Sequence, residues 1–394
     1  MTSMRAACLA ATLAPAIAAA AEVPVWFGTY TNPKTRSEGI YVARFDTESG
    51  TLTAPVLASP ARNPSFLAFH PRLPLLYAVS EIAGVDGRPG GAVEAFAIDE
   101  STGAISSRGA ESTGGAGPCH VTVDSRGRVV VAANYGGGSV ACLGLTADGL
   151  LRPLVSGSGD GGFVQHEWHR HGEPGIDPTR QDKPHAHSVD VLDGGVGVIV
   201  CDLGLDRVFV HALNPEQATL RPLSSCRLAA GAGPRHFARH RDGRRGWCVN
   251  ELDLTVTGLD VDAGSGELRA ARSASTLPPD VTDRTGFSCA EIAVHPGGRF
   301  LYASNRGHDS IAMFAIAPDT TDLEFLGTEP TRAKTPRHFA IAPGGKFLLV
   351  GGQGSNTVTV FAVDEQSGRL SFTGGTVEVP SPVCIAFRPE PRGH

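Results

Sequence analysis

Four side chains in this sequence have the types needed for acid–base chemistry on a small anion. His187 could accept or donate a proton near neutral pH, and the carboxylate of Glu251 could handle a second proton. Arg235 and Arg306 could hold a carboxylate or phosphate through paired hydrogen bonds and neutralise a developing oxyanion. The sequence contains no G-x-S-x-G motif, so no serine nucleophile competes with this set.

Three further polar residues stand beside these four in the sequence. His185 precedes His187 in Pro184-His185-Ala186-His187, which directly follows a long polar insertion that could cover a pocket. We expect His185, His236 and Asn305 to take part in substrate binding. Asn305 also has an ordinary alternative role, because Asn at a strand end often makes turn hydrogen bonds.

The insertion, residues 157–183, contains histidines that could bind a metal. It contains His166-Glu167-Trp168-His169-Arg170-His171, which resembles H-E-x-x-H but has Arg170 where the second His should be. We therefore reject a zinc protease site. A metal held by histidines of the insertion stays open as an alternative, although we expect none.

A recurring pattern of short strands must position these residues. Each copy reads as a strand entered from a turn, a Gly-containing turn, an apolar strand, a third alternating strand and an acidic turn before a fourth strand. Four antiparallel strands make one propeller blade. Six first-strand copies recur at a spacing of about 50 residues, at residues 63–69, 117–123, 184–189, 233–238, 287–294 and 335–341.

The seventh copy is split between the two ends of the chain. Residues 381–387 form a first strand with no second strand after it, whereas residues 25–30 and 39–45 match second and third strands. The sequence therefore predicts an all-β fold, a seven-bladed β-propeller whose first blade is closed by the C-terminal strand. We expect residues 22–394 to form this single domain, which has no free sheet edge and favours a monomer.

Overlaying the copies places the candidate residues in two columns at one end of the central channel. The first strands align Phe66, His120, His187, His236, Glu291 and His338. The second strands end on Tyr30, Glu81, Tyr135, Leu203, Glu251, Arg306 and Gln353. Charged groups that face a narrow channel need water or a ligand, so Glu251 and Arg306 in the second column indicate a binding site.

The composition and net charge of the chain argue against some classes of binding partner. The 394 residues carry a net charge of -6 without a block of like charges, which argues against nucleic acid or an acidic membrane surface. No stretch beyond the N-terminus approaches the roughly 18 apolar residues of a membrane span. The eight cysteines show no C-x-x-C spacing, and we expect most to be buried and unpaired, although one or two bridges stay possible.

The N-terminus has the layout of a secretory signal. Arg5 precedes an apolar run over residues 6–20, and Ala19-Ala20-Ala21 supplies a small-residue cleavage site before Glu22. We expect residues 1–21 to be a signal peptide and the protein to be exported to the periplasm or the outside of the cell.

At several motifs the chain resembles the lactonase family of seven-bladed propellers, which groups bacterial 6-phosphogluconolactonases with fungal 3-carboxy-cis,cis-muconate lactonising enzymes. The residues that carry the likeness, from about Val25 to Phe387, are Gly28-Thr29-Tyr30-Thr31, Ala133-Asn134-Tyr135-Gly136-Gly137-Gly138-Ser139-Val140, Pro184-His185-Ala186-His187-Ser188-Val189, Gly231-Ala232-Gly233-Pro234-Arg235-His236, Asn250-Glu251-Leu252, Ala303-Ser304-Asn305-Arg306-Gly307 and Thr335-Pro336-Arg337-His338-Phe339.

The resemblance implies hydrolysis of an anionic sugar-acid lactone in carbohydrate metabolism, without a metal or organic cofactor. It places His187 and Glu251 at the family's acid–base positions, and Arg235 and Arg306 at its substrate-anion positions. Two alternatives remain. A muconate-type lactonising cycloisomerase makes the same demands on a site. A secreted propeller that binds a ligand without turnover is the other alternative, since this fold hosts many functions and phosphogluconolactone arises in the cytoplasm.

Overall fold

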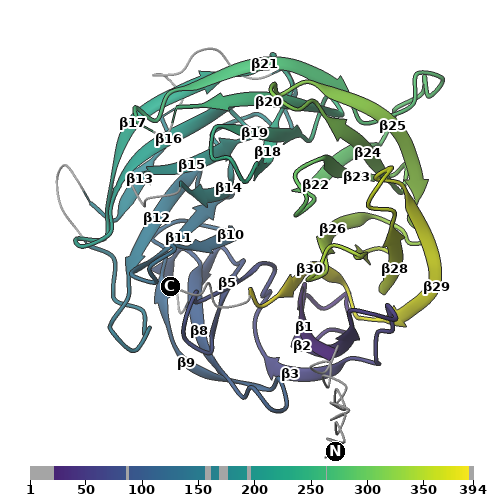
Figure 1. Ribbon diagram of the computed structural model, residues 1–394. Helices are drawn as coiled ribbons and strands as arrows, with labels where there is room; N and C mark the ends of the chain where they lie inside the picture. The colour runs from purple at the N-terminus through teal and green to yellow at the C-terminus, as the bar shows by residue number, and fades with distance from the viewer. Residues whose placement is uncertain are drawn as a thin grey trace, which may run out of the picture.

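Alternating apolar residues separated by Gly-containing turns build a chain of strands. The computed structural model describes residues 22–85, 88–155, 161–167, 176–192, 197–262 and 264–389, and within these ranges it contains thirty strands and no helix. Twenty-eight of the strands form seven four-stranded antiparallel sheets arranged as blades around a central axis (Figure 1). The remaining two, β6 (Gly84–Val85) and β7 (Arg88–Pro89), form a small separate hairpin.

Each blade runs from an inner strand at the channel to an outer strand at the rim. The inner strands are β4 (Leu67–Phe69), β10 (Pro118–Val123), β14 (Ala186–Val191), β18 (Pro234–Arg239), β22 (Ser288–Val294), β26 (Pro336–Ile341) and β30 (Pro382–Phe387). The second strands are β5 (Leu75–Ser80), β11 (Val129–Asn134), β15 (Gly197–Asp202), β19 (Arg245–Asn250), β23 (Phe300–Arg306), β27 (Phe347–Gly352) and β1 (Glu22–Thr29).

The two outer positions complete the blades. The third strands are β8 (Ala92–Ile98), β12 (Ser139–Gly144), β16 (Arg207–Asn214), β20 (Thr255–Val261), β24 (Ser310–Ile316), β28 (Thr357–Val363) and β2 (Gly39–Asp46). The fourth strands are β9 (Ile105–Ser112), β13 (Phe163–Gln165), β17 (Thr219–Arg227), β21 (Leu268–Ser275), β25 (Leu323–Pro330), β29 (Leu370–Glu378) and β3 (Val56–Pro60).

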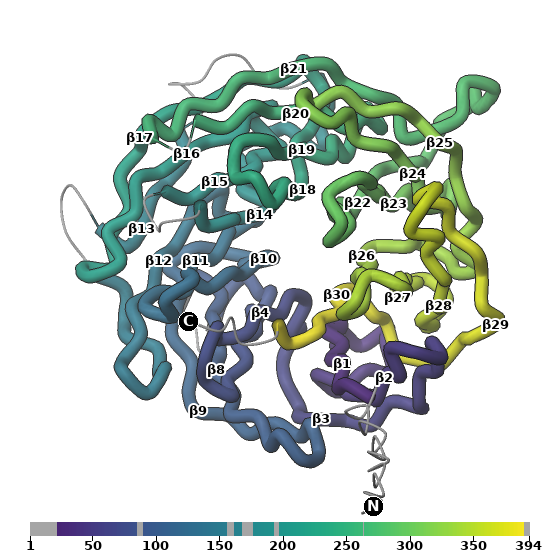
Figure 2. Tube along the Cα trace, in the orientation of Figure 1, coloured from purple at the N-terminus to yellow at the C-terminus, as the bar shows by residue number. Residues whose placement is uncertain are grey.

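The two ends of the chain share one blade. Strand β30 pairs antiparallel with β1, with Phe27 opposite Ile385 and Val25 opposite Phe387. The resulting sheet has the order β3-β2-β1-β30, and Figure 2 shows the C-terminal strand in yellow beside the purple N-terminal strands. The predicted seven-bladed propeller and its closure by the C-terminal strand are confirmed.

Apolar clusters between neighbouring blades hold the ring together. Val131 of β11 and Val140 of β12 pack with Val189, Val200 and Phe209 of the next blade in one buried cluster. The second strands are therefore covered on both faces, and every residue of β11 is buried. The seven described cysteines are free, and six of them are buried, as expected for small apolar side chains.

A β-bulge interrupts the pairing of the inner strands at the channel mouth. Register shifts between Pro118 and His120, Ala186 and Ser188, Pro234 and His236, and Pro336 and His338 each leave one residue unpaired with the second strand. The four unpaired residues, called the bulge column below, are Cys119, His187, Arg235 and Arg337. Bulges re-aim side chains, and they are frequent next to active sites.

The bulge corrects one part of the expected alignment. His187 was aligned with His120, His236 and His338, but Ser188 pairs with Cys201 at the position that those histidines occupy in their blades. The alignment was wrong by one residue in this blade. The other three inner strands begin with a proline before the bulge, whereas this strand begins with Ala186, so the histidine pattern alone misplaced the register.

A chain that ends at Pro380 tests the closure. It lacks β30, which exposes the pairing edge of β1 and removes Ile385 from the apolar cluster that contains Val25 and Phe27. We expect this chain to aggregate or to lose its cooperative thermal transition. A chain that ends at Pro389 keeps the whole described fold and is the matched control. A melting curve of the shorter chain that matched the control would contradict the closure.

Candidate active site

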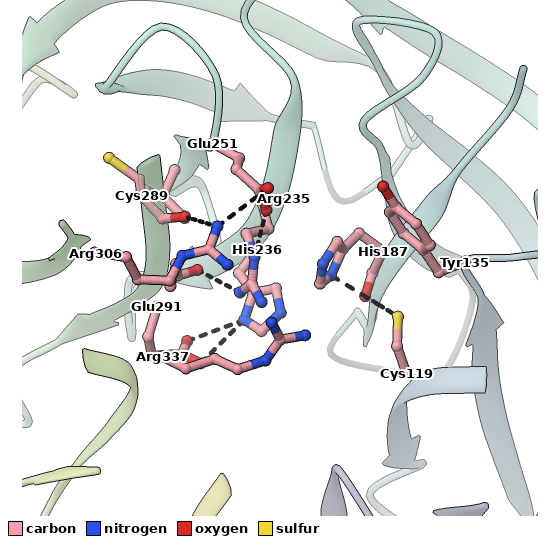
Figure 3. A network of polar contacts seen from close by, with 12 residues as sticks. Cys119, Tyr135, His187, Arg235, His236, Glu251, Cys289, Glu291, Arg306 and Arg337 are labelled. Atoms are coloured by element: carbon pink, nitrogen blue, oxygen red, sulfur yellow. Dashed lines mark hydrogen bonds and ion pairs between the residues drawn. The ribbon is translucent and has the colours of Figure 1, made fainter. Parts of the chain in front are cut away.

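The bulge column and the ends of the second strands meet at one mouth of the channel. Arg235 and Arg337 come from bulges in β18 and β26, while Glu251 follows β19 and Arg306 ends β23. Figure 3 shows these four side chains facing His187, which lies on the opposite side of the opening with Tyr135. The structure therefore brings together the four residues that the sequence predicted for acid–base chemistry and anion binding.

Glu251 is the centre of the charge arrangement. Its Oε2 accepts a hydrogen bond from Arg235 Nε at 2.8 Å, and its Oε1 lies 2.5 Å from Arg180 Nη2 and 3.1 Å from Arg306 Nη2. Arg235 and Arg306 also donate to the carbonyl oxygens of Ala290 (2.6 Å) and Cys289 (2.8 Å). One carboxylate thus orients three guanidinium groups, and two of them are tied to the neighbouring strand β22 as well.

Burial and these guanidiniums oppose each other in setting the charge of Glu251. Its side chain is 1% exposed, and burial alone would raise its pKa. The charges of Arg306, Arg235 and Arg180 outweigh burial and hold the pKa of Glu251 well below its usual range. Burial and the nearby Arg337 lower the pKa of Arg235 to about 10, so this guanidinium also stays charged at neutral pH.

His187 is the imidazole of the mouth. Its ring lies edge-on to Tyr135 at 5.2 Å between centroids, and its Nδ1 is 3.8 Å from Cys119 Sγ. Burial, and then the positive charges of Arg235 and other neighbours, lower the pKa of His187 well below its usual range. His187 is therefore neutral at pH 7, which is the form that can accept a proton.

A fourth guanidinium, that of Arg337, belongs to a separate chain of polar contacts. Arg337 Nη2 donates to the hydroxyl of Tyr30 at 2.9 Å, and this hydroxyl donates to Glu81 Oε2 at 2.9 Å. The Arg337 guanidinium also lies over the Tyr30 ring, 5.3 Å from its centroid. Among the described residues Arg337 makes no direct ion pair with a carboxylate, unlike the three arginines around Glu251.

A second layer of side chains lies below the bulge column and crosses the channel. It consists of Phe66, His120, His236, Glu291 and His338. Glu291 accepts a hydrogen bond from His236 Nδ1 at 3.0 Å and lies 3.1 Å from His338 Nε2. The backbone N–H of Ile385 donates to His338 Nδ1, so the proton of this ring is on Nε2 and points at Glu291. Phe66 and His120 pack against His236, which makes this layer the floor of the site.

Two of the predicted substrate-binding residues, Asn305 and His185, use their polar atoms in contacts with other residues of the fold. Asn305 Nδ2 donates to the carbonyl oxygen of Thr276 at 3.0 Å and to Ser310 Oγ at 3.2 Å. His185 stacks on Tyr135, and its two ring nitrogens contact the Tyr135 carbonyl oxygen and Asp182 Oδ1. The turn role considered for Asn305 accounts for its contacts, and His185 orients Tyr135 at the rim.

Arg180 is the residue of the mouth that the sequence did not indicate. It lies in the insertion, outside every repeat column, so neither alignment nor spacing could pair it with Glu251. Besides Glu251, Arg180 contacts the Tyr135 hydroxyl at 3.2 Å. Its neighbour Gln181 is buried and donates to the Leu203 carbonyl oxygen and to Asp206 Oδ1, which fixes this part of the insertion over the next blade.

Replacing Glu251 with Gln measures how much the mouth depends on its charge. The change leaves the buried Arg235 without a counter-charge, so we expect the free energy of unfolding to fall by about 3–5 kcal/mol. Because the pKa of Glu251 is lower in the folded state, this contribution is present at neutral pH. The difference between wild type and variant should narrow as the pH falls below about 4, where unfolded glutamate takes up its proton.

The matched control is Glu378→Gln, which removes the exposed ion pair with Arg36. Exposed pairs contribute little, so we expect a change within about 1 kcal/mol in denaturant titrations. Equal effects of the two substitutions would contradict the central place of Glu251.

Several known proteins are similar to this chain over most of its length. The chain is 34% identical over 362 residues to 6-phosphogluconolactonase of Bacillus subtilis, covering 92% of this chain and 97% of the relative. It matches the structure of a periplasmic gluconolactonase of Pseudomonas aeruginosa at 32% identity and a TM-score of 0.83, covering 93% and 99% of the two chains. A putative 6-phosphogluconolactonase of Bacteroides fragilis matches at 29% identity and a TM-score of 0.81, covering 93% and 98%. The family model of the seven-bladed β-propeller lactonases matches residues 24–387, and the chain therefore belongs to the lactonase family.

Proposed function

We propose that the protein hydrolyses a sugar-acid lactone at this mouth of the channel. The observation that carries the proposal is the presence of four guanidiniums and a buried neutral imidazole, His187, at one mouth of the channel. Relatives named 6-phosphogluconolactonase and gluconolactonase, which match over most of their length, support it. Hydrolysis of a lactone by this route uses only water and the side chains at the mouth.

The charges of the mouth favour a lactone that carries an anionic group. Arg180, Arg235, Arg306 and Arg337 face two carboxylates, Glu251 and Glu81. This set has a surplus of positive charge, and guanidiniums bind carboxylates and phosphates in a bidentate geometry. Among the described residues, Arg337 is the one of the four that makes no direct ion pair with a carboxylate, so we assign it to the anionic group of the substrate.

Hydrolysis can proceed with His187 as the proton carrier throughout. Neutral His187 takes a proton from water as the oxygen attacks the lactone carbonyl carbon, and the arginines stabilise the resulting oxyanion. The bond between the carbonyl carbon and the ring oxygen then breaks, and His187 returns the proton to that oxygen. The products are an open hydroxy acid and the original imidazole.

Glu251 has a different role from the proton transfer that the sequence suggested. A carboxylate whose pKa lies well below its usual range stays ionised at neutral pH, and an ionised carboxylate has no proton to donate. Its two oxygens are also occupied by contacts with three guanidiniums. We therefore assign Glu251 to positioning, because it holds Arg180, Arg235 and Arg306 at the spacing in which they meet the substrate.

We also propose that the protein is exported. The proposal rests on Arg5, the apolar run 6–20 and the small-residue site before Glu22, all outside the described residues. The similarity to a relative named as a periplasmic gluconolactonase supports it. Intact-mass measurement of protein secreted by the native cell should give a chain that begins near Glu22. Recovery of the full-length chain from the cytoplasm alone would contradict export.

Base consumption at constant pH, measured with phosphorylated and unphosphorylated aldonolactones, tests the activity. Wild type should hydrolyse at least one lactone above the spontaneous rate, and His187→Ala should lower kcat/KM by about 10²–10⁴-fold, the usual contribution of a general base. Because burial and arginine charges lower the pKa of His187, kcat/KM of wild type should stay constant as the pH falls through 6.5 and decrease only below that value.

The matched control for this assay is His308→Ala, which removes a half-buried imidazole that contacts Phe287 and Ser310. It should leave kcat/KM unchanged. Equal rates for wild type and His187→Ala would remove His187 from the mechanism. No rate above background with any lactone would favour the binding module without turnover.

A further inference from the structure

Two buried histidines outside the channel face each other at a spacing that is suitable for a metal. His166 follows β13 within the insertion, and His211 lies on β16 of the neighbouring blade. Their Nε2 atoms are 3.2 Å apart, and the side chains are 4% and 1% exposed. Two imidazole nitrogens bound to one tetrahedral metal at the usual bond length lie about 3.3 Å apart. The pair is therefore already at ligand spacing.

A carboxylate fixes the orientation of His166. Asp202 Oδ2 lies 2.6 Å from His166 Nδ1, while Asp202 Oδ1 accepts the backbone N–H groups of His185 and Leu205. Asp202 is thus held as an acceptor, so the proton of His166 is on Nδ1 and its Nε2 presents a lone pair toward His211. A carboxylate on the far nitrogen of a histidine is the arrangement found behind metal-binding imidazoles.

Among the described residues, His211 has a hydrogen-bond partner on one ring nitrogen only, the Nε2 that faces His166. Its Nδ1 is buried and, among the described residues, has no hydrogen-bond partner. Two neutral imidazoles can share one weak N–H···N bond, or they can both use their Nε2 lone pairs on a cation. Neutral imidazole is the form that binds metals.

The pair opens onto a pocket at the outer side of the two blades. The pocket has a volume of about 480 Å³ and is lined by, among others, His166, Glu167, Phe209, His211 and Ser225. Both imidazole side chains contribute to the wall of this pocket, so we expect a cation to enter from it. Within the described ranges no cluster of three or more His, Cys, Asp or Glu side chains is placed to hold a metal, so these two imidazoles would be its protein anchors.

We propose that His166 and His211 form a binding site for a divalent transition metal, Zn²⁺ being the representative ion. Imidazole ligands suit Zn²⁺, Cu²⁺ and Ni²⁺, whereas Mg²⁺ and Ca²⁺ prefer oxygen. The metal clips the first part of the insertion to the neighbouring blade. This assignment replaces the expectation that the protein holds no metal.

Zinc titration of the chelator-treated, full-length mature protein tests the site. Wild type should bind one equivalent of Zn²⁺ in calorimetry and gain thermal stability, while Mg²⁺ gives neither effect. His166→Asn and His211→Asn should each weaken Zn²⁺ binding by more than the 10–100-fold that is usual for losing an outer carboxylate. X-ray absorption of the zinc-loaded wild type should show two imidazole ligands, a result that does not depend on the folding of any variant.

Two control proteins separate this site from the other histidines. His187→Asn removes an imidazole of the channel mouth, and His169→Asn combined with His171→Asn removes the other two histidines of the H-E-W-H-R-H segment, which lie outside the described residues. Both should still bind one equivalent. A wild type without stoichiometric binding, an absorption spectrum without imidazole, or binding that disappears only in these controls would overturn the proposal and leave an ordinary hydrogen bond between two histidines.

Discussion

The buried charge of Glu251 is the interaction on which the mouth of this propeller depends. A carboxylate that is 1% exposed needs compensation, and it obtains it from Arg180 of the insertion, Arg235 of its own blade and Arg306 of the next blade. The largely buried guanidiniums of Arg235 and Arg306 would in turn be costly to leave without a counter-charge. The charges therefore fix one another, and the anion-binding geometry exists before any substrate arrives, which is the preorganisation that catalysis by charge stabilisation requires.

Much of this arrangement could be predicted from the sequence because it follows from local patterns repeated seven times. Alternating apolar strands and glycine turns set the blades, and the unpaired copies at the two ends of the chain revealed the closure. The ends of the second strands identified Glu251 and Arg306. His187 was identified as well, but it was aligned one residue away from its true position in the strand. A bulge adds one residue to a strand, and the residue types on either side do not reveal it.

Other parts of the site depend on contacts that a sequence pattern does not encode. Arg180 reaches Glu251 from an insertion that belongs to no repeat, and Arg337 meets Tyr30 only because the ring closes. The role of Glu251 was also not available from its type. A glutamate in a channel can be an acid, a base or a fixed counter-charge, and only the number of guanidiniums around it decides between them.

The insertion is therefore part of the functional site rather than an appended loop. Its first part is held to the neighbouring blade through His166 and Asp202, and its last part through Gln181 on Asp206. Between the second anchor and the channel lies Arg180, whose guanidinium contributes to keeping Glu251 ionised. Loss of the Gln181 anchor would free the adjacent Arg180, remove one of three counter-charges from a buried carboxylate and loosen Arg235 and Arg306 with it. The contacts that hold the insertion to the neighbouring blade thus affect the mouth by keeping Arg180 beside Glu251. The strands of the propeller do not have to move for this effect.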